Sequence, residues 1–248
     1  TLVYGEKEAM VIDAGFTRAD ALRIAANVLD SGKELKTIYV SQADPDYYFG
    51  VETIKEIFPT AEVVTTPAVL EKINAKLAGK IAFWGPKMGA NAPRTPVLPK
   101  AISGTTLTVD GQTVEIRGTT GPLAHRPYAW IPSIKAVVGN IGVFGANMHV
   151  WTADTQTVAE RSAWVAQLDE MAALQPALVV PGHMPAGTAL DVSNVTYTKG
   201  YLQAFEKNAA ATKTSAELID AMKKAYPAAP MGLSLEIGAK VNKGEMKW

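Results

Sequence analysis

The sequence predicts a mixed α/β fold, and three observations support it. Apolar strands alternate with amphipathic helices in the first third, the pair Asp110-Gly111 indicates a hairpin that begins a run of antiparallel strands, and helices end the chain. At 248 residues the chain is long for one domain, although layered α/β proteins often reach this length. We therefore expect a single domain over residues 1–248.

The composition is that of a folded protein that binds a small molecule. Hydrophobic residues make up 48% of the chain and charged residues 19%, which argues against disorder. The 24 basic and 24 acidic residues leave no net charge to attract nucleic acid or an anionic membrane. No apolar run is long enough to insert in a bilayer. Because the chain has no cysteine, a metal would need His, carboxylate or amide ligands.

The first third is predicted to alternate strand and helix. A helix capped by Thr17 and Asp20 ends at Ser31-Gly32, and a later helix begins at Thr66 and Pro67. Residues 80–104 have no periodicity and predict a long loop that contains Phe83, Trp84 and Met88. The other predicted elements are the strands 2–4, 9–12, 37–40 and 62–65, the helix 51–58, and an inner face of the first helix formed by Leu22, Ala25, Val28 and Leu29.

The rest of the chain is predicted to contain strands followed by helices. Thr157 and Glu160 form a capping box, and Trp164, Leu168 and Met171 share one face of the helix that follows. The other predicted elements are the strands 106–109, 113–116, 128–131, 136–138 and 178–180, the helices 194–211 and 215–226, and a polar tail.

Polar residues gather in three loops that follow predicted strands. These loops are residues 41–50, Gly139-Asn140 and Gly182-His183. Loops at the carboxyl ends of strands are where α/β proteins place their sites, because the sheet aims side chains that stay accessible. Gln42, Asp44 and Asp46 alternate there and offer oxygen donors to a metal or a polar substrate.

Structural roles are an open alternative for the same residues. Asp44 suits a helix N-cap, Pro45 a first helical position and Asp46 a first-turn acid. His125, His149 and His183 are single histidines, which are more often hydrogen-bonded within a protein than bound to a metal.

The order of these segments resembles the metallo-β-lactamase superfamily. Residues 39–50 resemble its signature, a strand followed by T-H-x-H-x-D-H-x-x-G, and Ser41, Asp46 and Gly50 fall on matching positions. Three further segments match in order, namely residues 11–15 (a strand and Asp-x-Gly), 137–140 (a strand and Gly-Asn for Gly-Asp) and 179–183 (a strand and Pro-Gly-His). The resemblance implies a four-layer αββα sandwich whose first strand or two would precede Thr1.

The metal ligands are less complete in this resemblance. Members of the superfamily hold two metal ions, usually zinc, but Gln42 and Asp44 replace the first two histidines, Tyr47 the third and Asn140 the bridging aspartate. Asp46 and His183 match, and His125 and His149 are candidates for the remaining ligand or the site mouth. The resemblance thus implies at most one divalent ion, zinc or a harder cation such as manganese, held by Gln42, Asp44, Asp46 and His183.

Two functions follow from this resemblance. The first is a hydrolase that cleaves an ester, lactone, thioester or amide with water activated by one metal ion, or by Asp46 and His183 as an acid–base couple. The second is a metal-free binding or regulatory protein. Its ligand would lie against an apolar lining from Tyr47, Tyr48, Phe49, Trp84 and Trp151, with Asn140 as a further lining residue. We expect a periplasmic or secreted location, and the sequence does not indicate an oligomeric state.

Overall fold

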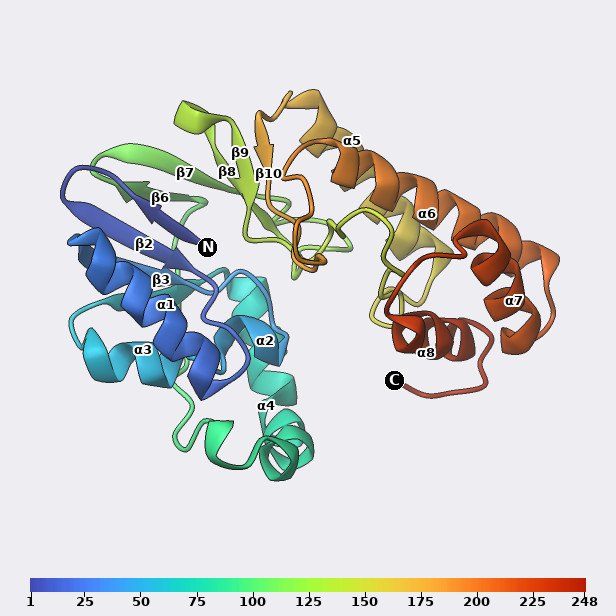
Figure 1. Ribbon diagram of the computed structural model, residues 1–248, viewed down its shortest axis with the longest axis horizontal. Coiled ribbons are helices and arrows are strands. Elements are labelled where there is room, and N and C mark those ends of the chain that lie inside the picture. Colours follow the sequence, from blue (N-terminus) through green and yellow to red (C-terminus); the bar gives the residue numbers. More distant parts are fainter. The chain divides into compact units, whose positions relative to one another are not determined.

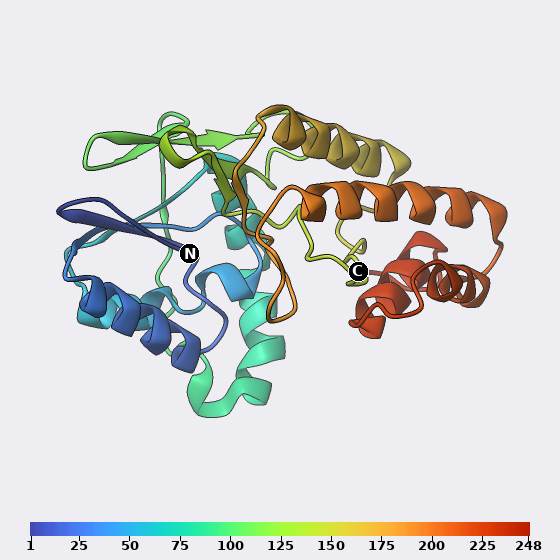
Figure 2. The ribbon, with the colours of Figure 1, turned by 45° about the horizontal axis from the view of Figure 1, so that its top comes forward.

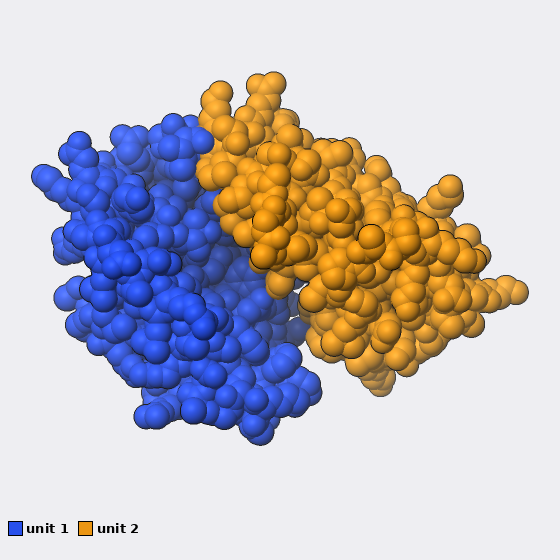
Figure 3. All heavy atoms as spheres, viewed as in Figure 1, with its two compact units in different colours: residues 1–134, 138–140 blue, residues 135–137, 141–248 orange.

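The computed structural model describes all 248 residues, Thr1–Trp248, as two compact units (Figure 3). Unit 1 contains residues 1–134 and 138–140, and unit 2 contains residues 135–137 and 141–248. None of the helices combines the length and the apolar character that crossing a bilayer requires.

The elements of unit 1 are β1 (Leu2–Tyr4), β2 (Glu8–Ile12), α1 (Arg18–Ser31), β3 (Glu34–Tyr39), α2 (Pro45–Tyr48), α3 (Val51–Ile57), β4 (Glu62–Thr65), α4 (Pro67–Met88), η1 (Gly89–Asn91), β5 (Lys100–Ala101), β6 (Thr106–Val109), β7 (Gln112–Arg117), β8 (Tyr128–Ile131) and η2 (Pro132–Ile134). Strand β9 (Ala136–Val138) spans the boundary between the units. The elements of unit 2 are α5 (Val158–Ala173), β10 (Leu178–Val179), α6 (Ser193–Ala211), α7 (Ser215–Ala225) and α8 (Gly232–Asn242).

The first sheet of unit 1 places the candidate loop 41–50 at one of its edges. Its order is β1-β2-β3-β4-β5, with β1 antiparallel and the other strands parallel to their neighbours. Because parallel strands end at the same edge, Asp13 after β2 and Ser41 after β3 become neighbours. Helices α1 and α3 cover one face of this sheet, and the antiparallel strands β6, β7 and β8 lie across the other (Figures 1 and 2).

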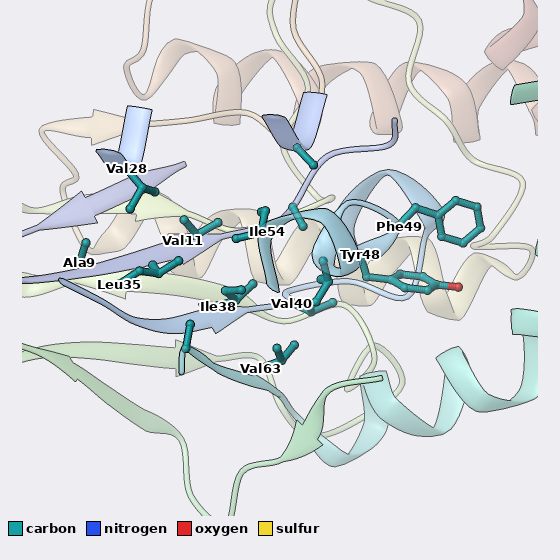
Figure 4. Packing of buried hydrophobic residues seen from close by; sticks show 14 of the residues in the cluster. Ala9, Val11, Val28, Leu35, Ile38, Val40, Tyr48, Phe49, Ile54 and Val63 are labelled. Atoms are coloured by element: carbon teal, nitrogen blue, oxygen red, sulfur yellow. The ribbon is translucent and has the colours of Figure 1, made fainter. Parts of the chain in front are cut away.

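The core of unit 1 holds this edge in place. Val11, Ile38 and Val63 from three strands pack with Val28 of α1 and Ile54 of α3 (Figure 4). A fully buried aliphatic side chain contributes about 1.5–3 kcal/mol through its removal from water. The strand ends are therefore fixed by a packed layer, on which the loop 41–50 is built.

Helix α1 confirms its predicted start and corrects its predicted inner face. Thr17 and Asp20 form the capping box, and Gly32 ends the helix with a φ of 65°. Ala21, like Ala25 and Val28, is buried, whereas Leu22 and Leu29 are 46% and 60% exposed. The prediction was wrong for the two leucines because small side chains face the sheet and the larger ones point outward.

The predicted loop 80–104 was wrong over its first part, because α4 continues to Met88. Ile81, Trp84 and Met88 pack against the core of unit 1, so tertiary contacts support a segment that has weak helical signals. Pro86 lies in the last turn, where it cannot donate a hydrogen bond to the carbonyl four residues earlier, and Gly89 with a φ of 55° ends the helix.

Unit 2 confirms the predicted helices and adds one. Thr157 and Glu160 form the predicted capping box of α5, which packs beside α6 (Figures 1 and 2). The predicted polar tail was wrong, because α8 buries Leu235 and Ala239. Gly238 hid this helix from sequence analysis, since glycine disfavours helix but is needed here: a Cβ would lie 2.3 Å from the Thr152 hydroxyl oxygen.

Candidate functional site

The strand-end loop of unit 1, residues 41–50, is fastened at its start by Asp13. The Asp13 backbone has a φ of 67°, a left-handed conformation that aspartate tolerates better than most residues. Its carboxylate accepts hydrogen bonds from the Ser41 amide at 2.7 Å and the Ser41 hydroxyl at 2.8 Å. The end of β2 is thereby tied to the end of β3.

Gly50 fastens the other end of the loop. Its amide donates to the Gly15 carbonyl at 3.1 Å, and the Ala14 amide donates to the Tyr47 carbonyl at 2.8 Å. A Cβ on Gly50 would lie 2.0 Å from the Ala14 oxygen, so only glycine fits this approach. The glycine of the sequence signature is thus explained by backbone packing.

Gln42, at the first replaced histidine position, is a buried amide that is half satisfied. Its Nε2 donates to the Pro127 carbonyl at 2.8 Å, which fixes the side chain. Its Oε1 has no hydrogen-bond partner within the protein, although the residue is only 1% exposed. A buried acceptor of this kind costs about 1–3 kcal/mol unless water or a ligand satisfies it.

Asp44, at the second replaced histidine position, is bound to Lys80 of α4. The Lys80 ammonium lies 2.6 Å from Asp44 Oδ1, and both side chains are partly buried. Asp44 occupies the N-cap position of α2, as the capping alternative expected, but its side chain makes no capping hydrogen bond. The ion pair with the ammonium replaces that weaker bond to a neutral N–H.

The surroundings of Tyr47 show which charged groups lie near the loop 41–50. It is buried, and its hydroxyl donates to the Asn140 carbonyl at 3.2 Å. Burial raises the pKa of Tyr47 well above its usual value, and the carboxylates of Asp46, Asp13 and Asp44 raise it further, while Arg126 opposes them. Three carboxylates and a guanidinium therefore lie close to one neutral phenol.

Asp13 is the carboxyl group most perturbed by this environment. Burial raises the pKa of Asp13 to about 7 against the hydrogen bonds from Ser41, and the nearby Asp46 carboxylate raises it further. A carboxyl group with a pKa near neutrality beside a second carboxylate is an arrangement that enzymes use for proton transfer.

Asn140 reaches the same edge through Gly139. Gly139 has a φ of 57°, and a Cβ there would lie 2.7 Å from the Ile12 side chain. The glycine lets the chain after β9 cross close to the end of β2. Asn140 is then 2% exposed, and its carbonyl accepts the Tyr47 hydrogen bond.

The remaining candidates of unit 1 lie in different surroundings. Tyr48 is a core residue, 1% exposed, in edge-to-face contact with Phe49. Trp84 packs edge-on against Phe16. His125 is half-buried in the turn before β8. Tyr48 and Phe49 thus belong to the packed interior, which weakens the prediction that they contact a ligand.

The candidates of unit 2 are held by aromatic neighbours. The His183 ring stacks on Phe144 with centroids 5.4 Å apart. The backbone carbonyl of His183 accepts a hydrogen bond from the Gly145 amide at 2.7 Å. His149 is 2% exposed, and its Nδ1 lies 3.0 Å from the Tyr201 hydroxyl. Burial lowers the pKa of His149, which favours the structural interpretation of this histidine. Trp151 contacts Trp248 edge-on and donates to Asp154 at 2.7 Å.

Lys80 and Arg126 are not among the site residues predicted from the sequence. Lys80 is four residues before Trp84 and three after Leu77, so it shares the inward face of α4, and this spacing was a usable signal. Arg126 is 5% exposed in a segment without periodicity, and nothing in the sequence marks it as buried.

Solved structures share this architecture over most of the chain. A metallo-β-lactamase family protein from Thermus thermophilus has a TM-score of 0.65 and 17% identity, covering 98% of this chain and 87% of its own. The chain has the metallo-β-lactamase fold. A β-lactamase domain protein from Burkholderia ambifaria has the same TM-score at 11% identity, covering 98% and 78%, and a metallo-β-lactamase from Pontibacter korlensis has a TM-score of 0.55 at 19% identity, covering 82% and 85%. No family model and no curated protein matches the sequence.

The residues present do not fit the two-metal site that the metallo-β-lactamase fold implies. No group of three or more His, Asp or Glu side chains is arranged to hold a metal ion. Asp44 is neutralised by Lys80, and Gln42 offers one neutral oxygen. Tyr47 stays protonated, and a tyrosine ligates well only as the phenolate. The metallo-β-lactamase fold is therefore present with a different set of charges at its ligand loop.

Proposed function

We propose that the chain is a hydrolase that cleaves an ester, lactone, thioester or amide of a small molecule, with water activated by Asp46 and without a bound metal ion. The metallo-β-lactamase fold supports the reaction class. The observation that carries the proposal is the carboxyl pair at the strand-end loop, because burial raises the pKa of Asp13 to about 7 and Asp46 lies close enough to raise it further.

The carboxyl groups of Asp13, Asp44 and Asp46 have different roles in this proposal. Asp44 is ion-paired with Lys80, and Asp13 accepts two hydrogen bonds from Ser41. Asp46 is partly exposed in the first turn of α2 and retains the aspartate of the signature. We assign Asp46 as the base that takes a proton from water, and Asp13 as a neighbouring group that exchanges a proton near neutral pH.

A hydrolysis assay tests this assignment. Purified protein is offered chromogenic esters, lactones, thioesters and a β-lactam, with chelator, with Mn²⁺ and with Zn²⁺. We expect one substrate class to be hydrolysed at a rate that chelator does not change. Asp46→Asn is expected to lower kcat by at least about a hundredfold, the usual contribution of a positioned general base.

Asp30→Asn is the matched control, because Asp30 is exposed at the end of α1. Its rate should equal that of wild type. Hydrolysis that requires added metal would contradict the metal-free chemistry. Rates at background in every condition would contradict the proposed hydrolase and favour the binding protein.

Two predictions extend beyond unit 1 and stay predictions. His183 would form the acid–base couple with Asp46, in which case His183→Gln lowers kcat as Asp46→Asn does, and the double variant loses little more than either. A periplasmic or secreted location would be tested by fractionating cells that express the full-length gene.

A further inference from the structure

Lys80 differs in placement from the other lysines of its helix. Ile73 and Leu77 of α4 face the core of unit 1. Lys80 lies seven residues after Ile73 and three after Leu77, so it shares their face of the helix. Lys72 and Lys76 are exposed, whereas the side chain of Lys80 is 21% exposed. An ammonium on a partly buried face is stabilised by an opposite charge, and Asp44 supplies one at 2.6 Å.

The loop that receives this ammonium is rich in negative charge. Asp13, Asp44 and Asp46 all act on Tyr47, so their carboxylates share one region, and the Arg126 guanidinium acts on Tyr47 in the opposite direction. In the metallo-β-lactamase fold a metal ion supplies positive charge to this loop. Here Lys80 is bonded to the residue at one of the ligand positions.

We infer that the Lys80 ammonium is a built-in cation that pairs with Asp44 of the loop 41–50 in place of a divalent metal and excludes a metal ion from this loop. The inference rests on contacts within unit 1 and deepens the proposed metal-free function. A divalent ion that approached Asp44 would meet the ammonium at short range and would also have to break the ion pair. Both effects oppose metal binding.

The test measures Mn²⁺ binding, since an oxygen-rich loop suits a hard cation. Titration calorimetry and thermal unfolding are recorded for wild type, Lys80→Met, Lys80→Arg and Lys72→Met. Wild type is expected to show no Mn²⁺-dependent change of its unfolding midpoint. Lys80→Met is expected to bind Mn²⁺ at least about tenfold more tightly and to gain a midpoint that rises with Mn²⁺ concentration.

The other variants test whether the positive charge at position 80 is what prevents Mn²⁺ binding. Lys80→Arg and Lys72→Met should behave as wild type, because one keeps the cation and the other lies on the exposed face. The double variant Asp44→Asn with Lys80→Met should lose the gained Mn²⁺ binding. If Lys80→Met fails to fold, Lys80→Gln repeats the test with a polar side chain.

Two results would overturn the inference. One is stoichiometric Mn²⁺ binding by wild type that Asp44→Asn abolishes, since the loop would then hold a metal beside Lys80. The other is a folded Lys80→Met or Lys80→Gln variant whose Mn²⁺ affinity equals that of wild type. Neither measurement depends on hydrolysis, so the inference and the proposed activity can fail separately.

Discussion

The charged side chains of unit 1 and unit 2 are satisfied in different ways. In unit 2 the Arg161 guanidinium is 3% exposed, donates to the Thr155 carbonyl at 2.7 Å, pairs with Glu206 and lies 5.7 Å from the Phe205 ring centre. The Asn242 amide, turned so that its oxygen faces Arg161, accepts from both terminal nitrogens at 3.0 Å. One buried cation is thus surrounded by partners from α6, α8 and the segment before α5.

In unit 1 the carboxyl groups of Asp13, Asp44 and Asp46 lie close to one another around Tyr47. Burial raises the pKa of Asp13 to about 7, so ionising it costs the folded state free energy. A fully satisfied buried charge fixes how helices pack, whereas crowded carboxyl groups reduce stability and are retained where chemistry needs them. The difference separates a structural ion pair from a candidate site within one chain.

The largest expected effect is on Arg161. Arg161→Met leaves Glu206, which is 30% exposed, without its cation, and removes the guanidinium that joins three segments. We expect unfolding free energy to fall by about 3–5 kcal/mol in urea titrations, the usual cost of breaking a buried pair. The rate of any hydrolysis by the folded variant should be unchanged.

Lys199→Met is the control for that change, because Lys199 pairs with Asp169 on the surface at side-chain exposures of 35% and 54%. Such a pair contributes about 0–1 kcal/mol. Equal losses for Arg161→Met and Lys199→Met would remove the distinction between buried and exposed charges on which the comparison rests.

Asp13 should make the stability of unit 1 fall as pH rises. Its folded pKa of about 7 exceeds the ordinary 3.8, so the folded state binds the proton more tightly. The contribution of Asp13 to the free energy of unfolding is therefore fully present below about pH 4, and it is lost as pH rises through 7. Relative to Asp13→Asn, the free energy of unfolding of wild type should fall by about 2–4 kcal/mol across this window, since a shift of one pKa unit corresponds to about 1.4 kcal/mol.

Urea titrations of both proteins across that window measure the difference, and Asp30→Asn should follow wild type. Wild type and Asp13→Asn curves that stay parallel at all pH values would show that Asp13 ionises as an ordinary carboxyl group. The site would then lack the proton-exchanging neighbour that the proposed function gives to Asp46.

The fold was more predictable from sequence than the site. Strand periodicity and the capping boxes at Thr17 and Thr157 depend on neighbours in sequence, and the structure confirms them. Helix α8 was missed because its burial depends on Gly238 meeting Thr152, a contact between distant segments. Arg126 was missed for the same reason. The spacing within α4 could have marked Lys80 as inward-facing, but its partner Asp44 is distant in sequence and is evident only in the structure.

The smallest expected effect tests whether the loop is held by backbone packing as well as by charge. Gly50→Ala places a methyl group where the Ala14 oxygen lies 2.0 Å away, and backbone cannot move as a flexible side chain does. We expect a loss of about 1–3 kcal/mol, as for overpacking elsewhere. Gly79→Ala is the matched control, because Gly79 lies in α4 with open space around it and alanine favours helix by up to about 1 kcal/mol. Opposite signs in urea unfolding would show that the signature glycine of this loop is required by the approach of Ala14. If Gly50→Ala is as stable as wild type, the loop has room to shift, and the fixed placement of Asp46 beside Asp13 loses its backbone support.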